Sequence, residues 1–328
     1  MDLPLNQILQ GNSLEILQTL PDNSINTCIT SPPYFGLRDY GVDGQIGLEG
    51  DVEEFVQSLV NLFKEVKRVL KDDGTVWLNL GDTYWGGGWR NDMIREGSGD
   101  IQQGHKGTHD AKQIKNATGN HPIYKPKDLM GVPWKVAFGL QRDGWYLRQD
   151  IIWHKPNPMP ESVTDRCTKN HEYIFLLSKS KSYYFDHESI KEPAKPDKSI
   201  RDRDNTKLNN TPGRTKMKGL KSNHYEMKNK RSVWTVTKKS FKEAHFATYP
   251  PELIEPCILA GCPEGGVVLD PFSGAGTTAL VSIENNRNYV GIELNPEYIE
   301  IAEKRLEPVQ VKQNQLNHNK KIVSKFWN

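Results

Sequence analysis

Residues 267–278 read VVLDPFSGAGTT, and this stretch decides the fold class. The apolar run 267–270 predicts a buried β-strand. Gly274 and Gly276 allow a tight turn in which the backbone can approach a ligand closely. The residues after the turn predict a helix over 277–284, whose first amides favour a negatively charged group. The stretch therefore predicts a strand–loop–helix unit of an α/β fold, with a ligand at the carboxyl end of the strand.

A carboxylate stands at the end of the next expected strand, 289–293. Glu293 can there accept hydrogen bonds from both hydroxyls of a ribose. No Gly-Lys-Ser/Thr follows the glycine loop, which argues against a nucleoside triphosphate. Thr278 and Ala279 stand where the third glycine of a dinucleotide fingerprint would fall. We therefore predict S-adenosylmethionine as the cofactor, although a glycine pair alone would suit a tight turn in any α/β domain.

The rest of the chain repeats this alternation of apolar strands and amphipathic helices. A strand over 25–30 (INTCIT) leads to a helix over 52–70, with apolar residues at helical spacing, and then to a strand over 75–80. Short connections of this kind are typical of a parallel sheet. We expect further strands at 145–153 and 172–177, and further helices at 129–142, 251–259 and 296–306.

Three segments break this rhythm. Residues 84–125 are rich in Gly, Asn and His and predict a long insertion. Residues 191–242 hold 16 Lys and Arg against 5 Asp and Glu, whereas the whole chain has a net charge of only +2. This local charge suggests a polyanionic partner, but a solvated, disordered insertion has the same composition. The polar, basic residues 309–328 predict a poorly ordered tail.

The loop after the strand 25–30 reads Ser31-Pro32-Pro33-Tyr34. Two prolines fix φ and remove two amide donors. The carbonyl oxygens of Ser31 and Pro32 and the Ser31 hydroxyl can then face a cleft as acceptors. Rigid acceptors beside an aromatic ring suit the exocyclic NH₂ group of a planar base, which would stack on Tyr34. The alternative, a proline-rich turn without catalytic role, is the commoner use of such residues.

With both motifs in view, the sequence resembles the β-group of DNA amino-methyltransferases. In that family a (D/N/S)PP(Y/F) catalytic motif precedes a DPF-x-G-x-G-T cofactor motif. Ser31–Tyr34 matches the first motif and Asp270–Thr277 matches the second. Asn170-His171-Glu172-Tyr173 is similar to a family strand that ends near the active site. The resemblance spans roughly residues 8–306.

The resemblance implies a role for each matching residue. Ser31, Pro32, Pro33 and Tyr34 would be catalytic. The cofactor would contact the DPF motif, the ribose-binding acid, the segment just before the motif, and the position where the family often has Gly-Asp and this sequence has Gly11-Asn12. The cofactor residues implied in this way are Asp270, Pro271, Phe272, Ser273, Gly274, Gly276, Thr277, Glu293, His245, Phe246, Ala247 and Asn12.

The order of the motifs has a structural consequence. In one doubly wound sheet both loops must lie at the carboxyl ends of neighbouring strands. We therefore expect a circularly permuted, Rossmann-like S-adenosylmethionine-dependent methyltransferase fold of class α/β. Residues 1–178 and 245–308 would form the catalytic domain, with 179–244 as the basic target-recognition region that the family carries there. The DNA-binding candidates are Lys216, Lys218, Lys221, Lys228, Lys230 and Arg231.

Cytosine N4 and adenine N6 both fit this chemistry on a base extruded from the duplex. In the family, Ser at the first motif position is usual for cytosine N4 and Asp for adenine N6, so Ser31 favours cytosine. Carbon-5 methylation would need a cysteine nucleophile, but Cys257 lies in an expected helix and is interpreted as a core residue. An RNA or protein amide methyltransferase is disfavoured by the motif order, and a DNA-binding protein without catalysis by the intact motifs.

The composition narrows the setting. No run of about 18 apolar residues and no basic segment followed by an apolar one occur, so we expect neither a membrane span nor a secretory signal. Four scattered cysteines form no disulfide framework or zinc spacing, and no metal is expected. We expect a cytoplasmic protein that acts on double-stranded DNA. The sequence leaves open whether a cognate restriction endonuclease accompanies it and whether it is a monomer or a homodimer.

Overall fold

The computed structural model describes residues 2–37, 42–86, 121–194, 226–238 and 248–326, with the backbone alone described at residue 314 and from residue 316 onward. Within these residues the main feature is an eight-stranded sheet in the order β1-β10-β9-β2-β3-β5-β4-β8. A small second sheet pairs β6 with β7. The strands are β1 (Gln7–Gln10), β2 (Ile25–Thr30), β3 (Leu70–Leu80), β4 (Tyr146–His154), β5 (His171–Ser178), β6 (Glu192–Pro193), β7 (Met227–Lys228), β8 (Val233–Thr235), β9 (Val267–Asp270) and β10 (Asn288–Glu293).

The direction of the strands brings distant parts of the chain to one edge of the sheet. β1, β10, β9, β2 and β3 run parallel, β5 runs antiparallel to both β3 and β4, and β8 runs parallel to β4. The amino end of β5 therefore lies beside the carboxyl ends of the other strands. The pairing of β2 with β9 confirms the expectation that the proline loop and the glycine loop follow neighbouring strands.

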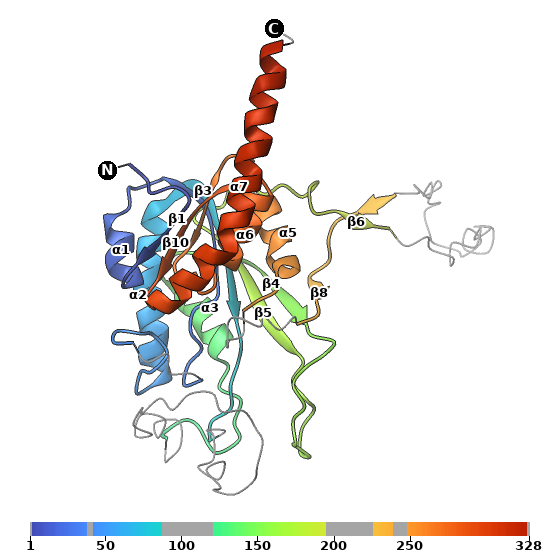
Figure 1. Ribbon diagram of the computed structural model, residues 1–328. Coiled ribbons are helices and arrows are strands. Elements are labelled where there is room, and N and C mark those ends of the chain that lie inside the picture. The colour runs from blue at the N-terminus through green and yellow to red at the C-terminus, as the bar shows by residue number, and fades with distance from the viewer. Residues whose placement is uncertain (1, 38–41, 87–120, 195–225, 239–247, 327–328) are drawn as a thin grey trace, which may run out of the picture.

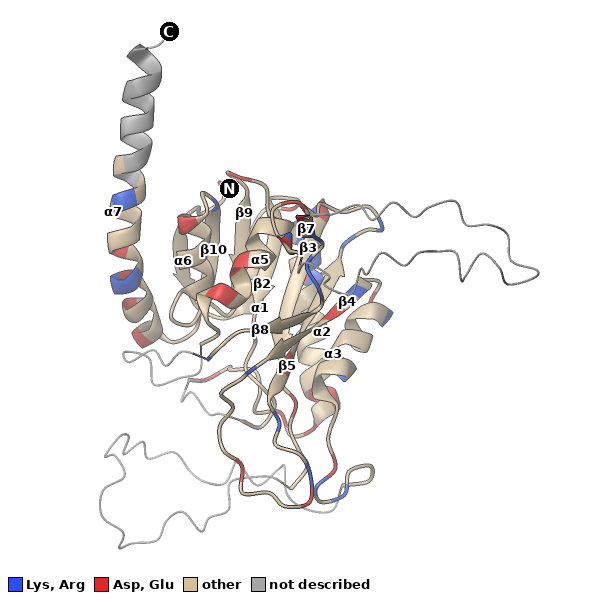
Figure 2. Cartoon of the chain, turned by 90° about the vertical axis from the view of Figure 1, so that its right-hand side faces the viewer, with Lys and Arg blue, Asp and Glu red and all other residues tan. Residues whose placement is uncertain are grey.

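Helices cover both faces of the sheet. α1 (Ser13–Thr19), α2 (Val52–Val69) and α3 (Val132–Arg142) pack on one face, and α5 (Pro251–Gly261), α6 (Thr277–Glu284) and α7 (Pro296–Phe326) on the other. In the turned view of Figure 2 the layers stand side by side, with α6 and α7, the sheet, and then α2 and α3. This arrangement, with a mainly parallel sheet, confirms the predicted α/β class.

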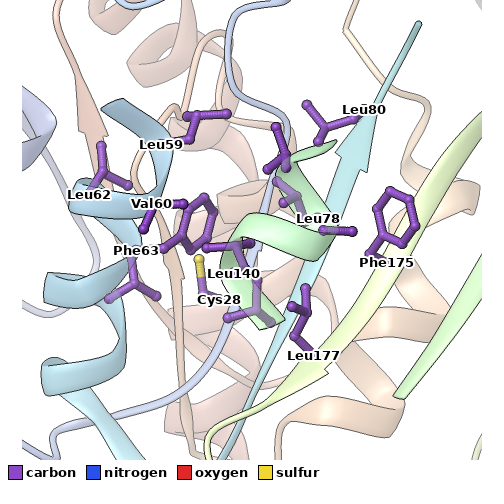
Figure 3. Close-up of a cluster of buried hydrophobic side chains, with 14 of the residues drawn as sticks. Cys28, Leu59, Val60, Leu62, Phe63, Leu78, Leu80, Leu140, Phe175 and Leu177 are labelled. Carbon is purple, nitrogen blue, oxygen red and sulfur yellow. The ribbon is translucent and has the colours of Figure 1, made fainter. Parts of the chain in front are cut away.

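Alternation along the central strands divides the core into two layers. Successive side chains of a strand point to opposite faces, so Cys28 joins the cluster under α2 and α3 while Ile29 joins the cluster under α5. Trp77 likewise faces α5, and its neighbour Leu78 faces α2. Figure 3 shows the first cluster, in which side chains of α2 and α3 interlock with those of β2, β3 and β5. Both faces of these strands are buried, which is why they read as continuous apolar runs.

Most expected elements are confirmed, with shifted ends. α2 ends at Val69, and β3 begins at Leu70 rather than at residue 75. Asp51 caps α2 by accepting a hydrogen bond from the Glu53 amide at 2.7 Å. β1, α1, β6, β7 and β8 were not predicted.

The tail after Pro308, which was expected to be poorly ordered, is helical, because α7 continues to Phe326. Val309 packs against a cluster of buried residues between α6, α7 and β10 that includes Ile283 and Leu306. The Gln310 side-chain amide donates to the Tyr289 hydroxyl at 3.1 Å. These contacts hold the first turn beyond the proline. The Lys and Gln residues that follow are good helix formers, so the helix can run on past the body of the molecule (Figure 1).

Candidate active site

A cavity of about 210 Å³ opens at the edge where the strands end. Residues following β1, β2, β4, β8, β9 and β10 all contribute to its wall. It holds both predicted motifs in one space. Its lining includes Asn12, Ser13, Ser31, Pro32, Pro33, Tyr34, Asn79, Lys155, Glu172, Lys238, Tyr249, Pro271, Phe272, Ser273, Gly274, Ala275, Thr277, Glu293, Asn295 and Tyr298.

A buried carboxylate joins the strands that carry the two motifs. Asp270, the last residue of β9, is 2% exposed, and Thr30, the last residue of β2, donates to it at 2.6 Å. The hydroxyls of Thr278 and Tyr249 donate to the other oxygen at 2.6 and 3.0 Å. The Phe272 amide adds a fourth hydrogen bond at 3.1 Å. The starting points of the proline loop and the glycine loop are thus tied to one group.

This placement refines the role expected for Asp270. It lies beneath the cavity wall rather than in it. Burial raises the pKa of the Asp270 carboxyl, and burial together with that carboxylate raises the pKa of Tyr249 well above its ordinary value. The residue holds the two loops together and stands behind the groups that face the cavity.

The proline loop presents an aromatic ring whose position is fixed from two sides. A Cβ atom on Gly81, at the end of β3, would lie 2.5 Å from Cε2 of Tyr34, so the ring occupies the space that a side chain would need. The Tyr34 hydroxyl donates to Oε2 of Glu172 at 2.8 Å. On the far side, the Gly36 amide donates to the Gly47 carbonyl at 2.8 Å, closing the turn after the motif.

Three polar residues beside Tyr34 were missing from the predicted site. Asn79 donates to Glu172 Oε2 at 3.3 Å and to the Tyr173 carbonyl at 3.0 Å. Lys155 pairs with Glu172 and lies over the Trp153 ring at 4.2 Å from its centre. Glu172 belongs to the quoted motif Asn170–Tyr173. Lys155 and Asn79 follow or end apolar strands, a position typical of site residues in α/β sheets.

The glycine loop is shaped by two residues with positive φ, Gly274 at 51° and Gly276 at 73°. The Gly274 amide donates to Oε2 of Glu293 at 2.8 Å, and the Asn295 amide donates to Oε1 at 2.9 Å. These bonds orient the carboxylate and leave further lone pairs on each oxygen. Burial raises the pKa of Glu293. The predicted acid is therefore oriented in the cavity wall with capacity to accept more hydrogen bonds.

Neighbouring residues complete this half of the wall. The Ser13 hydroxyl donates to the Pro271 carbonyl at 2.5 Å and so ties α1 to the glycine loop. Asn12 caps α1 by accepting from the Leu14 amide at 2.9 Å, which occupies its side-chain oxygen. Among the described residues, Ser273 is one of few whose buried side-chain polar atom has no hydrogen-bond partner. Gly276 is the N-cap of α6 and packs against Ala302 rather than lining the cavity.

The predicted DNA-binding residues fall into two groups. Lys216, Lys218 and Lys221 lie outside the described residues, as do the cofactor candidates His245, Phe246 and Ala247. Lys228 and Arg231 both contact Glu192, at 3.4 and 2.7 Å. Lys230 lies over the Trp234 ring at 5.1 Å. The described basic residues thus lie next to β8, which extends the central sheet beyond β4.

Other sequence-based interpretations concern residues away from the cavity. Cys257 is 1% exposed in α5, and burial raises the pKa of its thiol, so its interpretation as a core residue is confirmed. In the part of the chain that the structure describes, His, Cys, Asp and Glu form no cluster suited to a metal ion. No helix in that part is long and apolar enough to cross a membrane.

Known proteins share both sequence and fold with this chain. A family model for N6 and N4 methyltransferases, described as DNA methylase, matches residues 25–304. The chain belongs to this DNA methylase family. It is 45% identical to the type II methyltransferase M.Cfr9I of Citrobacter freundii over 92% of this chain and 87% of that protein. It is 46% identical to the type II methyltransferase M.SmaI of Serratia marcescens, over 92% of this chain and 90% of that protein.

Solved structures show the same fold at lower identity. The cytosine-N4-specific PvuII DNA methyltransferase superposes with a TM-score of 0.61 at 18% identity, covering 94% of this chain and 91% of that one. The complex of M1.HpyAVI with SAM gives a TM-score of 0.51 at 18% identity, covering 92% and 98%. The predicted methyltransferase fold is therefore confirmed.

Proposed function

We propose that this DNA methyltransferase transfers a methyl group from S-adenosylmethionine to N4 of a cytosine extruded from double-stranded DNA. One observation carries the proposal. The acceptor loop Ser31–Tyr34 and the oriented carboxylate of Glu293 line the same cavity at the same edge of the sheet. A base held at the first group would thus meet a nucleoside cofactor held at the second.

The glycine-loop half of the cavity fits S-adenosylmethionine. Glu293 has free lone pairs for the two ribose hydroxyls, since its two backbone hydrogen bonds use only part of its accepting capacity. The buried Ser273 hydroxyl beside it has no described partner. Gly274, Thr277 and the first turn of α6 favour the negatively charged end of a ligand. When bound, the cofactor would supply a methyl group activated by its sulfonium.

The proline-loop half fits an exocyclic amine. The Ser31 hydroxyl and the Pro32 carbonyl would accept its two N–H groups, and Tyr34 would stack on the ring. Held in this way, the amine keeps its lone pair directed at the methyl group. As the N–C bond forms, the bond between the methyl group and the sulfonium would break and leave its electron pair on a neutral thioether sulfur, and one amine proton would pass to solvent. No covalent bond between the protein and the base is required. The hydrogen bond from the Tyr34 hydroxyl to Glu172 supports this role because it holds the ring in one orientation.

The choice of cytosine N4 rests on Ser31 and on the cytosine-N4-specific PvuII enzyme among the structural relatives. The alternative is adenine N6, because both amines present two donors to the same acceptors. Since relatives with about 45% identity are type II methyltransferases, we also propose that the protein is the modification enzyme of a restriction–modification system. DNA would lie against the basic segment around β7 and β8, with an affinity that falls steeply with salt.

The proposal is tested by incubating the protein with unmethylated genomic DNA and S-adenosylmethionine, digesting to nucleosides, and measuring mass spectra. N4-methylcytosine is the expected product, and sequencing of the modified DNA then gives the recognition site. N6-methyladenine would keep the fold and the mechanism but overturn the choice of base. If neither product forms, the substrate would be RNA or protein, or the protein would bind DNA without catalysis.

A further inference from the structure

An arm of the chain extends from the active edge of the sheet, between β4 and β5, over residues 155–170 (Figure 1). Met159 on this arm is 74% exposed, the largest exposed fraction among the large hydrophobic residues that the structure describes. Isolated exposed apolar side chains are ordinary on protein surfaces. Met159 differs from such a residue in how firmly it is held and in what it stands next to.

The backbone at Met159 is stiffened by its neighbours. Pro158 and Pro160 flank it, and each proline fixes its own φ and restricts the residue before it to extended conformations. Farther along the arm, Arg166 donates to Glu161 at 2.6 Å, and the Lys169 amide donates to the same carboxylate at 3.3 Å. A stiff arm loses little conformational entropy when it enters a complex.

The arm is fastened to the rim of the cavity. The Asn157 side chain donates to the Lys238 carbonyl at 3.0 Å and accepts from the Lys238 amide at 3.0 Å. Lys238 and Lys155 both line the cavity. Met159 lies four positions after Lys155, so their Cα atoms lie at most about 14 Å apart. The exposed thioether is therefore carried by a residue whose Cα lies within about 14 Å of the Cα of a residue that lines the cavity.

Base extrusion creates a gap in the stack that something must fill. Removing a base from a duplex costs stacking and pairing energy, and proteins that deform DNA often insert Met, Leu, Phe or Ile between base steps. We propose that Met159 is this wedge, entering the base stack as the target base moves into the cavity. The proposal rests on the proposed function, because it requires a DNA base as the target. Met159 would then be a positioning residue that acts on the duplex.

The test compares two duplexes that differ in how much free energy is needed to extrude the target base. The substrates carry the recognition site found by sequencing. In one duplex the target base is paired, and in the other it lies opposite an abasic position. Met159→Ala and Met159→Leu are measured on both duplexes beside the wild-type protein. Val163→Ala, which truncates another exposed apolar residue of the same arm, is the matched control.

For the paired duplex we expect Met159→Ala to lower kcat/KM at least tenfold, with Met159→Leu and Val163→Ala within about twofold of wild type. On the duplex without a partner base, the ratio of Met159→Ala to wild type should return to near one, because the base there is already easy to extrude. An equal loss on both duplexes, or no loss on either, would overturn the wedge.

The wild-type reaction separates this inference from the proposed function. Its methylated nucleoside shows which base is the target. The ratio of kcat/KM for Met159→Ala to kcat/KM for the wild-type protein can be measured whichever base is methylated. N6-methyladenine in the wild-type product with a ratio restored on the abasic duplex would overturn the cytosine assignment and support the wedge. A wild-type protein that methylates neither duplex would overturn both proposals.

Discussion

The loops that follow β2 and β9 stand side by side and differ in the polarity of the backbone they offer. The loop after β2 contains Pro32 and Pro33, so it has lost two N–H donors and is left with oxygen acceptors. The loop after β9 contains Gly274 and Gly276, with positive φ, and its Gly274 amide reaches a carboxylate at 2.8 Å. The first loop offers hydrogen-bond acceptors, and the second offers backbone hydrogen-bond donors.

This contrast shows how one sheet edge can hold two different partners a short distance apart. Part of this difference lies in the main chain. Prolines remove backbone N–H donors from one loop, and glycines expose backbone N–H donors in the other. Asp270 beneath both loops accepts from Thr30 on one side and Thr278 on the other. Both loops are thus held by Asp270. A substitution within one loop should affect that loop alone, whereas a substitution of Asp270 should affect both.

The largest effect is expected from Ser31→Ala, which removes an acceptor from the proline loop only. Loss of one preorganised polar contact to a reacting group costs about 100- to 1000-fold in kcat, and we expect a fall of this size. Affinity for S-adenosylmethionine, measured by calorimetry, should stay within about twofold because the glycine loop is untouched. Full turnover in this variant would remove Ser31 from the mechanism.

Alteration of the shared support should affect both loops. Asp270→Ala leaves the hydroxyls of Thr30, Thr278 and Tyr249 without their acceptor, and we expect the free energy of unfolding to fall by about 3 kcal/mol. Denaturation with urea measures this change. Asp270→Asn should cost less, since an amide can still bond to hydroxyls that rotate.

The pH dependence of stability gives a second reading of Asp270. Burial raises its pKa in the folded protein above the unfolded value. Its contribution is therefore fully present below the unfolded pKa and is lost as pH rises through the folded pKa. Asp270→Asn should remove this part of the pH profile, and an unchanged profile would contradict the assignment.

A moderate effect confined to the glycine loop is expected from Glu293→Gln. Hydrogen bonds to a charged group contribute about 1.5–3 kcal/mol, so the dissociation constant for S-adenosylmethionine should rise roughly 10- to 100-fold. Because burial raises the pKa of Glu293, wild-type affinity should fall with decreasing pH earlier than an ordinary glutamate would predict. The variant should lack this dependence, and Glu284→Gln on the exposed end of α6 should behave as wild type.

The smallest effect is expected from Gly81→Ala, which acts on the proline loop indirectly. The new Cβ would displace the Tyr34 ring and weaken its hydrogen bond to Glu172. We expect kcat to fall roughly tenfold with little change in cofactor affinity. A change in cofactor affinity as large as the change in kcat would show that the loops are coupled more tightly than their contacts indicate.

The sequence predicted the structure best where a strand and the loop that follows it are adjacent in the chain. The strands β2 and β9, both loops, and the acid Glu293 could be predicted because apolar runs and special backbone residues adjoin in the chain. The strand β5 was predicted, but its antiparallel direction relative to β3 and β4 was not, because no local pattern reveals strand direction. Lys155 and Asn79 could therefore not be placed beside Glu172 in the site. β8 was missed because three residues inside a basic segment give too little periodicity.

The role of Asp270 and the end of α7 show a second limit. A motif match places Asp270 beside the cofactor, but its burial follows from four partners spread over the chain. Pro308 is a helix-stop signal by its own chemistry. The contacts of Val309 and Gln310 with other elements override that signal, and a sequence pattern does not contain them.

The hydrogen bond between Thr30 and Asp270 joins residues 240 positions apart. A ribosome adding about 5–20 residues per second needs roughly 12–48 seconds to cover that distance. Throughout this interval β2 is present without β9, its neighbour on one side. The acceptor loop and the glycine loop can meet only after residue 276 has been made. A nascent chain shorter than this has no assembled cavity, and the site forms only once β9 and β10 have joined the sheet.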